Sequence, residues 1–137
     1  MTVQSSTDHR AAPTSATDPE AADLEVDPEV VESLRSLSDE ETPDFFRNLV
    51  EEFRHHAELR LAELRHAAAA GDAELIYRSA HSLRGSAGNL GARSLSSTLA
   101  ELQDLGRSGR LLGAGELLER AVGSYQRAID ILARYGS

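Results

Sequence analysis

The 137-residue sequence contains no cysteine and no tryptophan, and it has only three phenylalanines and three tyrosines. Without cysteine, the chain cannot form a disulfide framework, a thiolate metal site or a cysteine nucleophile. No apolar run approaches the length of a membrane span, and the N-terminus lacks the basic and then apolar pattern of a signal peptide. These absences predict a soluble cytoplasmic protein that does not enter a membrane.

A basic excess is also lacking, because the formal net charge is −9. Nucleic-acid binding is therefore not expected. Residues 1–28 contain six acidic residues and one arginine, so more than half of the net negative charge lies there. Residues 1–26 are rich in Ser, Thr, Ala, Pro and Asp and poor in large apolar residues, a composition typical of disorder. We expect a disordered acidic tail over residues 1–26 and one domain over residues 27–137.

The sequence of the domain is helical in its periodicity. Asp27 and Pro28 suit the N-cap and first position of a short helix, and Pro43 can begin a long second helix. Gly71 and Asp72 can end that helix and cap a third, which is expected from Ala73 to about Leu90. Apolar residues recur at steps of three and four in the second, fourth and last helices: Phe46, Val50, Phe53, Ala57, Leu61 and Leu64; Leu95, Leu99, Leu102 and Leu105; Leu118, Val122, Tyr125, Ile129 and Leu132.

The expected fold is all-α. Gly91 can supply a left-handed C-terminal cap for the third helix, and residues 106–115, "GRSGRLLGAG", are expected to form a flexible connection between the last two helices. Short connections between long amphipathic helices favour antiparallel neighbours. We therefore predict an antiparallel up-and-down four-helix bundle with a short N-terminal helix over one end.

The third helix contains a histidine followed by three glycines, in the stretch "AHSLRGSAGNLGA" (residues 80–92). On a helical wheel, His81 lies roughly 140° from the centre of the apolar stripe, with Gly85 roughly 180° and Gly88 roughly 120° from it. Glycines used for packing inside the bundle should line the stripe, and these do not. On an exposed face, they allow another molecule to approach the backbone beside His81.

A neutral imidazole is a competent nucleophile near pH 7, and the guanidinium of Arg84, one turn further on, matches the oxygens of a phosphoryl group. The alternative is an ordinary surface histidine among helix-weakening glycines.

The residues "HSLRGSAGNLGA" resemble the signature of histidine-containing phosphotransfer (HPt) domains, in which His is followed by an apolar residue, Lys or Arg, Gly, small residues and Leu-Gly-Ala. The preceding "AAAAGDAELIYRSA" is similar to the family's approach to its phosphorylated helix, and the similarity covers roughly residues 28–135. The resemblance implies a phosphorelay carrier that accepts a phosphoryl group from a receiver-domain aspartate and passes it to another receiver domain.

The resemblance also implies site residues. His81 would be phosphorylated on Nε2, Arg84 stands where the family usually has Lys, and Gly85 would leave space for the receiver. Gln103, 22 residues after His81, matches a family Gln that orients the histidine through Nδ1. Arg107, one turn later, matches a further basic residue. Gly88 adds to the clearance.

A docking surface is expected around His81. Tyr77 and Arg78 project toward the His81 side of the helix, and Phe45 lies off the main stripe of its own helix. Tyr77 could equally be a residue at the boundary of the core.

The chain is not expected to be an enzyme. Its "GSAGNLG" lacks the Lys-Ser/Thr ending of a phosphate-binding loop, so the chain cannot make its own phosphoryl donor. The resemblance implies that Mg²⁺ is supplied by the partner receiver domain, so we expect no cofactor and no metal bound to this chain, which should be a monomer.

Two other functions are compatible with an exposed histidine on a helical bundle. A sensor-kinase dimerisation domain usually has an acid directly after the histidine, whereas here Ser82 follows His81. A non-phosphorylated helical adaptor would keep the fold and only bind receiver domains.

A metal-binding bundle is a third alternative. Glu52 with His55, and Glu63 with His66, have the Glu-x-x-His spacing of di-iron bundles. Both pairs fall on one helix, away from its apolar stripe, so we predict a solvated face there. His56 is expected to be a packed or partly buried ring.

Overall fold

The structure, a computed structural model, describes residues 24–135. Residues 1–23, which contain most of the tail predicted to be disordered, and residues 136–137 lie outside the described part. The described chain forms five helices and no strand: α3 (Pro28–Arg35), α4 (Phe45–Ala70), α5 (Ala73–Asn89), α6 (Arg93–Ser108) and α7 (Ala114–Tyr135).

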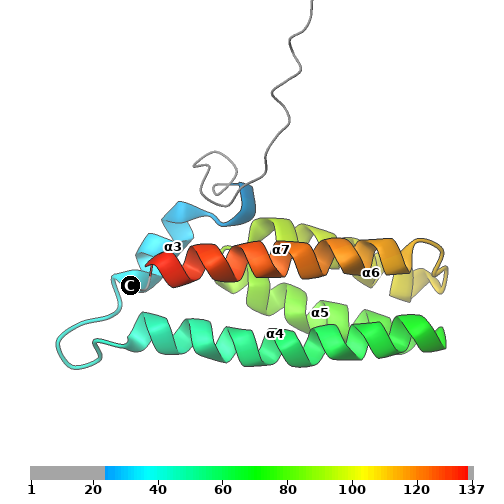
Figure 1. Cartoon of the computed structure of the whole chain (residues 1–137), viewed down its shortest axis with the longest axis horizontal. Helices are drawn as coiled ribbons and strands as arrows, with labels where there is room; N and C mark the ends of the chain where they lie inside the picture. Colours follow the sequence, from blue (N-terminus) through cyan, green and yellow to red (C-terminus); the bar gives the residue numbers. More distant parts are fainter. Residues whose placement is uncertain (1–23, 136–137) are drawn as a thin grey trace, which may run out of the picture.

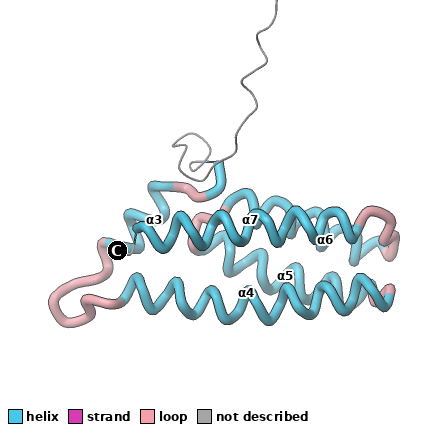
Figure 2. Tube along the Cα trace, viewed as in Figure 1, coloured by secondary structure: helices cyan, strands magenta, loops and turns pink. Residues whose placement is uncertain are grey.

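The four long helices form the predicted antiparallel bundle (Figure 1). Each packs on the next along the chain, most extensively α5 on α6, and α7 returns to α4 and closes the bundle. Short loops join α4 to α5 and α5 to α6, as the tube trace in Figure 2 shows. The short α3 lies at one end of the bundle against α4 and α7. Among the described residues, no helix is both long and apolar enough to cross a bilayer.

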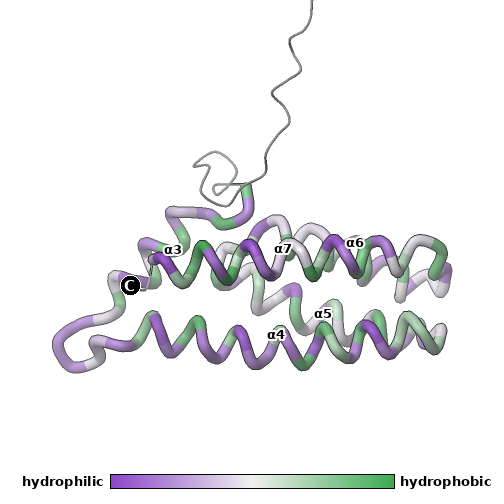
Figure 3. The backbone as a smooth tube through the Cα atoms, viewed as in Figure 1, coloured by the Kyte–Doolittle hydropathy of each residue, from purple (hydrophilic) through white to green (hydrophobic). Residues whose placement is uncertain are grey.

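The core consists of the stripes that the periodicity predicts. On α4, all six stripe residues from Phe46 to Leu64 are buried, and on α5 the stripe from Ile76 to Leu90 is buried too. Only Leu105 and Val122, among the stripe residues of α6 and α7, are partly exposed. Figure 3 shows the corresponding alternation of apolar and polar residues along each helix. The hydrophobic effect therefore fixes which face of each helix turns inward.

Caps at both ends hold α5 in place. The Asp72 side chain accepts a hydrogen bond from the Leu75 backbone N–H, and Gly71 ends α4 in the left-handed conformation, with φ 69°. At the other end, Gly91 has φ 76°, and the Ala92 N–H donates to the Ala87 carbonyl at 2.9 Å. This is the Schellman arrangement, in which the left-handed residue turns the chain so that the last carbonyls of the helix are satisfied.

The packed chain begins before the predicted domain boundary at residue 27. Val26 is only 2% exposed, and the carboxylate of Glu25 forms an ion pair with Arg127 of α7. The Asp27 N–H donates to the Gly91 carbonyl at 2.8 Å, which ties this segment to the end of α5. The tail prediction was therefore wrong for residues 24–26, because Val26 buries its side chain in the core and Glu25 has a distant cationic partner that composition does not reveal.

Two helix ends also differ from the prediction. α4 begins at Phe45 rather than at Pro43, because Asp39 accepts hydrogen bonds from the backbone of residues 41 and 42 and holds the preceding chain in a turn. α6 continues to Ser108, so the connection to α7 comprises residues 109–113 instead of 106–115. Gly106 lies inside α6 because it packs directly on α5.

Candidate functional site

The exposed face of α5 carries His81 midway along the helix. His81 is exposed, while its neighbours Ala80 and Leu83 are completely buried. The buried stripe of α5 therefore fixes the rotation of the helix, and this rotation directs His81 outward. The wheel-based prediction of an exposed histidine is confirmed.

Arg84 and Gln103 are brought together by the packing of α5 on α6. The Arg84 Nη1 donates to the Gln103 Oε1 at 3.0 Å, and Gln103 is only 4% exposed. No hydrogen bond joins Gln103 to His81 among the described residues, although the resemblance implied one. The structure differs from that expectation because the guanidinium of Arg84 occupies the amide oxygen, and Gln103 instead holds the position of the arginine.

The imidazole of His81 contacts the ring of Tyr77, one turn earlier on α5. The ring centroids are 5.8 Å apart and the planes are 11° from parallel, which is an offset stack. The guanidinium carbon of Arg107, on α6, lies 5.5 Å from the centroid of the Tyr77 ring. Tyr77 is half-buried, so it lies at the edge of the core and also touches the site.

Space around His81 is open where the glycines lie. A Cβ placed on Gly85 would meet nothing within 4 Å, and Gly85 is exposed. Gly88 is also exposed, but a Cβ there would be in ordinary contact with Ser96 Oγ of α6 at 3.8 Å, so the space beside it is less open. The bare backbone next to His81 is therefore centred on Gly85.

Gly106 supports the site, although the sequence pattern predicts it in the connection between the last two helices. A Cβ there would lie 2.6 Å from the Tyr77 backbone nitrogen and 2.8 Å from the Ala73 carbonyl oxygen. Only a glycine allows α5 and α6 to approach this closely. A signal was present, because Gly106 continues the stripe of Leu99 and Leu102 by a further four residues, but the residue was assigned to the connection.

A polar cluster lies on the other side of His81, between α5 and α4. The buried Ser79 donates through Oγ to Glu63 Oε1 at 2.8 Å, and Arg60 Nη1 lies 2.9 Å from the same oxygen. Arg60 also donates to Ser82 Oγ, which is 3.3 Å from His56 Nε2. Glu63 therefore does not lie on a simple solvated face, as its distance from the apolar stripe predicted, and the periodicity of α4 gives no sign of this cluster.

Charge and hydrogen bonding stabilise the ionised Glu63. Burial by itself raises the pKa of this carboxyl, but the hydrogen bonds from Ser79 and Arg60 and the charges of Arg60 and Arg78 outweigh burial, so its pKa is lowered. The positive charge of Arg78 therefore also stabilises the carboxylate of Glu63 on α4, although the Arg78 side chain is exposed like His81.

The remaining histidines of α4 do not form a metal cluster. His55 and His66 are exposed, and His56 is half-buried as predicted. Within residues 24–135, no group of three or more His, Asp or Glu side chains could hold a metal ion.

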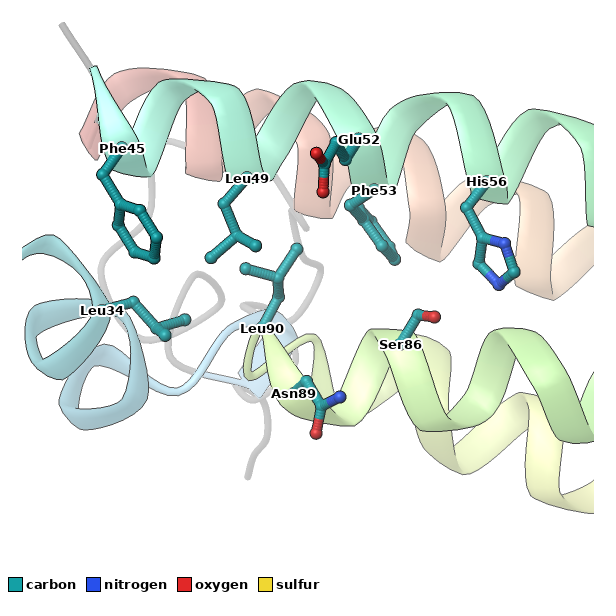
Figure 4. A pocket seen from close by; sticks show the side chains of 9 residues that line it. All are labelled: Leu34, Phe45, Leu49, Glu52, Phe53, His56, Ser86, Asn89 and Leu90. Carbon is teal, nitrogen blue, oxygen red and sulfur yellow. The ribbon is translucent and has the colours of Figure 1, made fainter. Parts of the chain in front are cut away.

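An apolar groove lies between α3, α4 and α5, next to this polar cluster (Figure 4). Phe45, which was predicted to lie off the main stripe of its helix, projects into the groove with Leu34 and Leu49, and His56 and Ser86 mark its far end. The cavity has a volume of about 430 Å³.

The fold and the site define a class: an antiparallel four-helix bundle that presents a histidine on the exposed face of α5, beside an arginine and a bare glycine. A family model described as the Hpt domain matches residues 48–134, well over half of the chain. The crystal structure of histidine-containing phosphotransfer protein B from Pseudomonas aeruginosa PAO1 is similar, with a TM-score of 0.73 and 29% sequence identity. The match covers 82% of this chain and 94% of that one. No curated protein sequence matches significantly.

This chain belongs to the HPt family. Its function is histidine phosphotransfer in a phosphorelay, and the family consists of phosphoryl carriers and not of classical enzymes.

Proposed function

We propose that this protein accepts a phosphoryl group on His81 from the phosphorylated aspartate of one receiver domain and passes it to another. The observation that carries the proposal is the exposure of His81 on a helix whose opposite face is fixed in the core. The other described histidines, His55, His56 and His66, lie on α4, outside the family signature.

The chemical step is a displacement at phosphorus. The Nε2 lone pair of a neutral imidazole, protonated at Nδ1, forms the N–P bond while the P–O bond to the aspartate breaks. The aspartate leaves as a carboxylate with the electron pair of the broken bond, and the ring keeps its Nδ1 proton and becomes a phosphoimidazolium. The reverse step on a second receiver restores neutral His81, so the carrier is unchanged after each passage.

Three neighbours of His81 serve this step. Arg84 supplies a cation for the phosphoryl oxygens, and its hydrogen bond to Gln103 restricts the motion of the guanidinium. Gly85 allows the receiver backbone to approach, because nothing occupies the space beside it. Arg78, Arg107 and Gly88 flank this area and are assigned to the receiver-contacting surface.

We assign the metal to the partner. The charged side chains close to His81 on this surface include Arg78, Arg84 and Arg107, which are cations and cannot ligate Mg²⁺. Mg²⁺ held by the receiver would neutralise charge on the transferring group. The chain lacks a Walker phosphate loop, so we infer a stoichiometric carrier that depends on another protein for its donor. A monomer is expected, since a single histidine on one bundle completes the site.

The test is phosphoryl transfer from a panel of phosphorylated receiver domains with Mg²⁺, read by mass spectrometry under alkaline conditions that preserve phosphohistidine. Wild-type protein should gain one acid-labile phosphate on His81. His81→Gln should gain none, and the matched control His66→Gln, which removes an exposed histidine from α4, should behave as wild type.

Chemical phosphorylation by phosphoramidate separates the alternatives. A protein that binds receivers and is phosphorylated on His81 by phosphoramidate, but by no receiver of a panel that phosphorylates a control HPt domain, would be a helical adaptor. Phosphate transferred from a receiver to His81→Gln would refute the assignment of the acceptor, whereas phosphoramidate can also label the exposed His55 and His66. Light scattering that shows a dimer would favour a kinase dimerisation domain.

A further inference from the structure

Tyr77 is the aromatic residue that touches the acceptor ring. Its ring is nearly parallel to that of His81 at 5.8 Å between centroids, and both residues lie on α5, four positions apart. Residues at this spacing are neighbours on a helix surface, so the stack depends on the side-chain rotamers and not on the helix alone. Something must therefore hold the Tyr77 ring where it is.

Two contacts from α6 hold it. Gly106 lets the α6 backbone approach the Tyr77 nitrogen so closely that a Cβ would lie only 2.6 Å from it. The next residue, Arg107, places its guanidinium carbon 5.5 Å from the centre of the Tyr77 ring. Arg107 is itself paired with Asp104 at 3.3 Å. The base of Tyr77 is thus fixed by backbone packing and its ring by a cation, while only part of the side chain remains accessible.

We propose that Tyr77 is a positioning residue for His81. Its ring limits rotation of the imidazole about χ2, so that the nucleophilic nitrogen keeps one orientation toward the approaching phosphoryl group. This inference rests on the proposed function, because it needs His81 to be the acceptor. Gly106 and Arg107 thereby act on the site through Tyr77, and Tyr77 has a role beyond receiver docking or core packing.

A bound receiver and a small donor should respond differently to the loss of the ring. Within a receiver complex, the reacting atoms meet in one geometry, so restricted rotation of His81 speeds the step. Phosphoramidate can approach the imidazole from any accessible direction, so the orientation of the ring matters little for it. Receiver affinity depends on the whole docking surface and should hardly depend on how the imidazole rotates.

The experiment compares wild type, Tyr77→Phe and Tyr77→Leu in the full chain. Transfer from one phosphorylated receiver is measured by rapid quench over a range of receiver concentrations, which separates the rate at saturation from the half-saturating concentration. Tyr77→Leu should lower the saturating rate about three- to tenfold, the rate ratio that corresponds to the interaction free energy of one aromatic pair. The half-saturating concentration and the rate with phosphoramidate should not change. Tyr77→Phe keeps the ring and should restore the wild-type rate.

A spectroscopic signature accompanies the rates. The ring current of Tyr77 shifts the carbon-bound protons of the His81 imidazole, so these NMR signals should move in Tyr77→Leu and stay close to wild type in Tyr77→Phe. Circular dichroism verifies that each variant is folded.

Other outcomes overturn the inference in distinguishable ways. A wild-type saturating rate in Tyr77→Leu refutes positioning, and a raised half-saturating concentration alone shows docking instead. A slow Tyr77→Phe points to the hydroxyl and not to the stacked ring. Failure of the proposed function is separate, because wild-type protein would then gain no phosphate on His81 from any receiver, although phosphoramidate would still label it.

Discussion

Gly85 and Gly106 provide a matched pair for testing how the bundle positions its site. Both are helical glycines, one on α5 and one on α6, and both would gain the same methyl group in a change to alanine. A Cβ on Gly85 meets nothing within 4 Å, whereas a Cβ on Gly106 would lie within 2.9 Å of three backbone atoms of Ala73 and Tyr77. Both substitutions therefore raise helix propensity, but only Gly106→Ala overpacks the contact between α5 and α6.

The shared effect is helix propensity, which favours alanine over glycine by about 1 kcal/mol in a helix interior. Gly85→Ala should therefore raise the free energy of unfolding by about that amount. Gly106→Ala adds an overpacking cost of about 3 kcal/mol, the upper end of the usual range, because backbone atoms cannot rotate out of the way. The net loss is about 2 kcal/mol, and the two variants should differ by about 3 kcal/mol.

Urea unfolding followed by circular dichroism at 222 nm measures both free energies directly. In thermal unfolding, a difference of about 3 kcal/mol corresponds to about 12 °C for a domain of this size. Gly106→Ala should also weaken the NMR signature of the Tyr77 and His81 stack, since α6 must move away from α5. If Gly106→Ala is as stable as Gly85→Ala, the close approach of α5 and α6 is not what requires a glycine at this position, and the reasoning fails.

Two further predictions concern the surface of α5 and the polar cluster behind it. Gly85→Gln should keep the fold and raise the free energy of unfolding nearly as much as Gly85→Ala, because Gln is also a strong helix former and the position is open. The same variant should obstruct transfer from receivers by at least about tenfold, because a long side chain fills the approach to His81. Rapid-quench transfer beside phosphoramidate labelling checks this, and full transfer activity would contradict the clearance argument. Glu63→Gln should lower the free energy of unfolding at pH 7 and reduce the loss of stability in acid. A carboxyl whose pKa is lowered in the folded state contributes stability above its ordinary pKa of 4.5, and this contribution is lost as the pH falls through the lowered pKa. Urea unfolding from pH 7 to pH 3 tests the second prediction, and parallel curves for variant and wild type would count against it.

Much of the site could be predicted because it depends on one helix. The apolar stripe of α5 and the caps at Asp72 and Gly91 fix the rotation and the ends of that helix, and therefore the exposure of His81 and Gly85. The identity of the family likewise depends on a short contiguous run of residues. The roles of His81, Arg84 and Gly85 in transfer remain predictions for the experiments above.

Contacts between helices could not be predicted in the same way. Arg84 pairs with Gln103 across 19 positions, and Glu25 pairs with Arg127 across 102. The order of residues fixes which face of a helix is apolar, but it does not fix how far one helix slides along another. Gln103 was therefore expected at the histidine, and it bonds to the arginine instead.

The sequence by itself determined the helices, their inward faces and the exposed histidine, because the helical period and the hydrophobic effect act along each segment separately. The tertiary structure alone decided what surrounds that histidine. The register and separation of α5 and α6, set by the missing side chain of Gly106, bring Arg107 over Tyr77 and Gln103 to Arg84. That separation depends on the packing of all four helices at once, which is why no single stretch of sequence contains it.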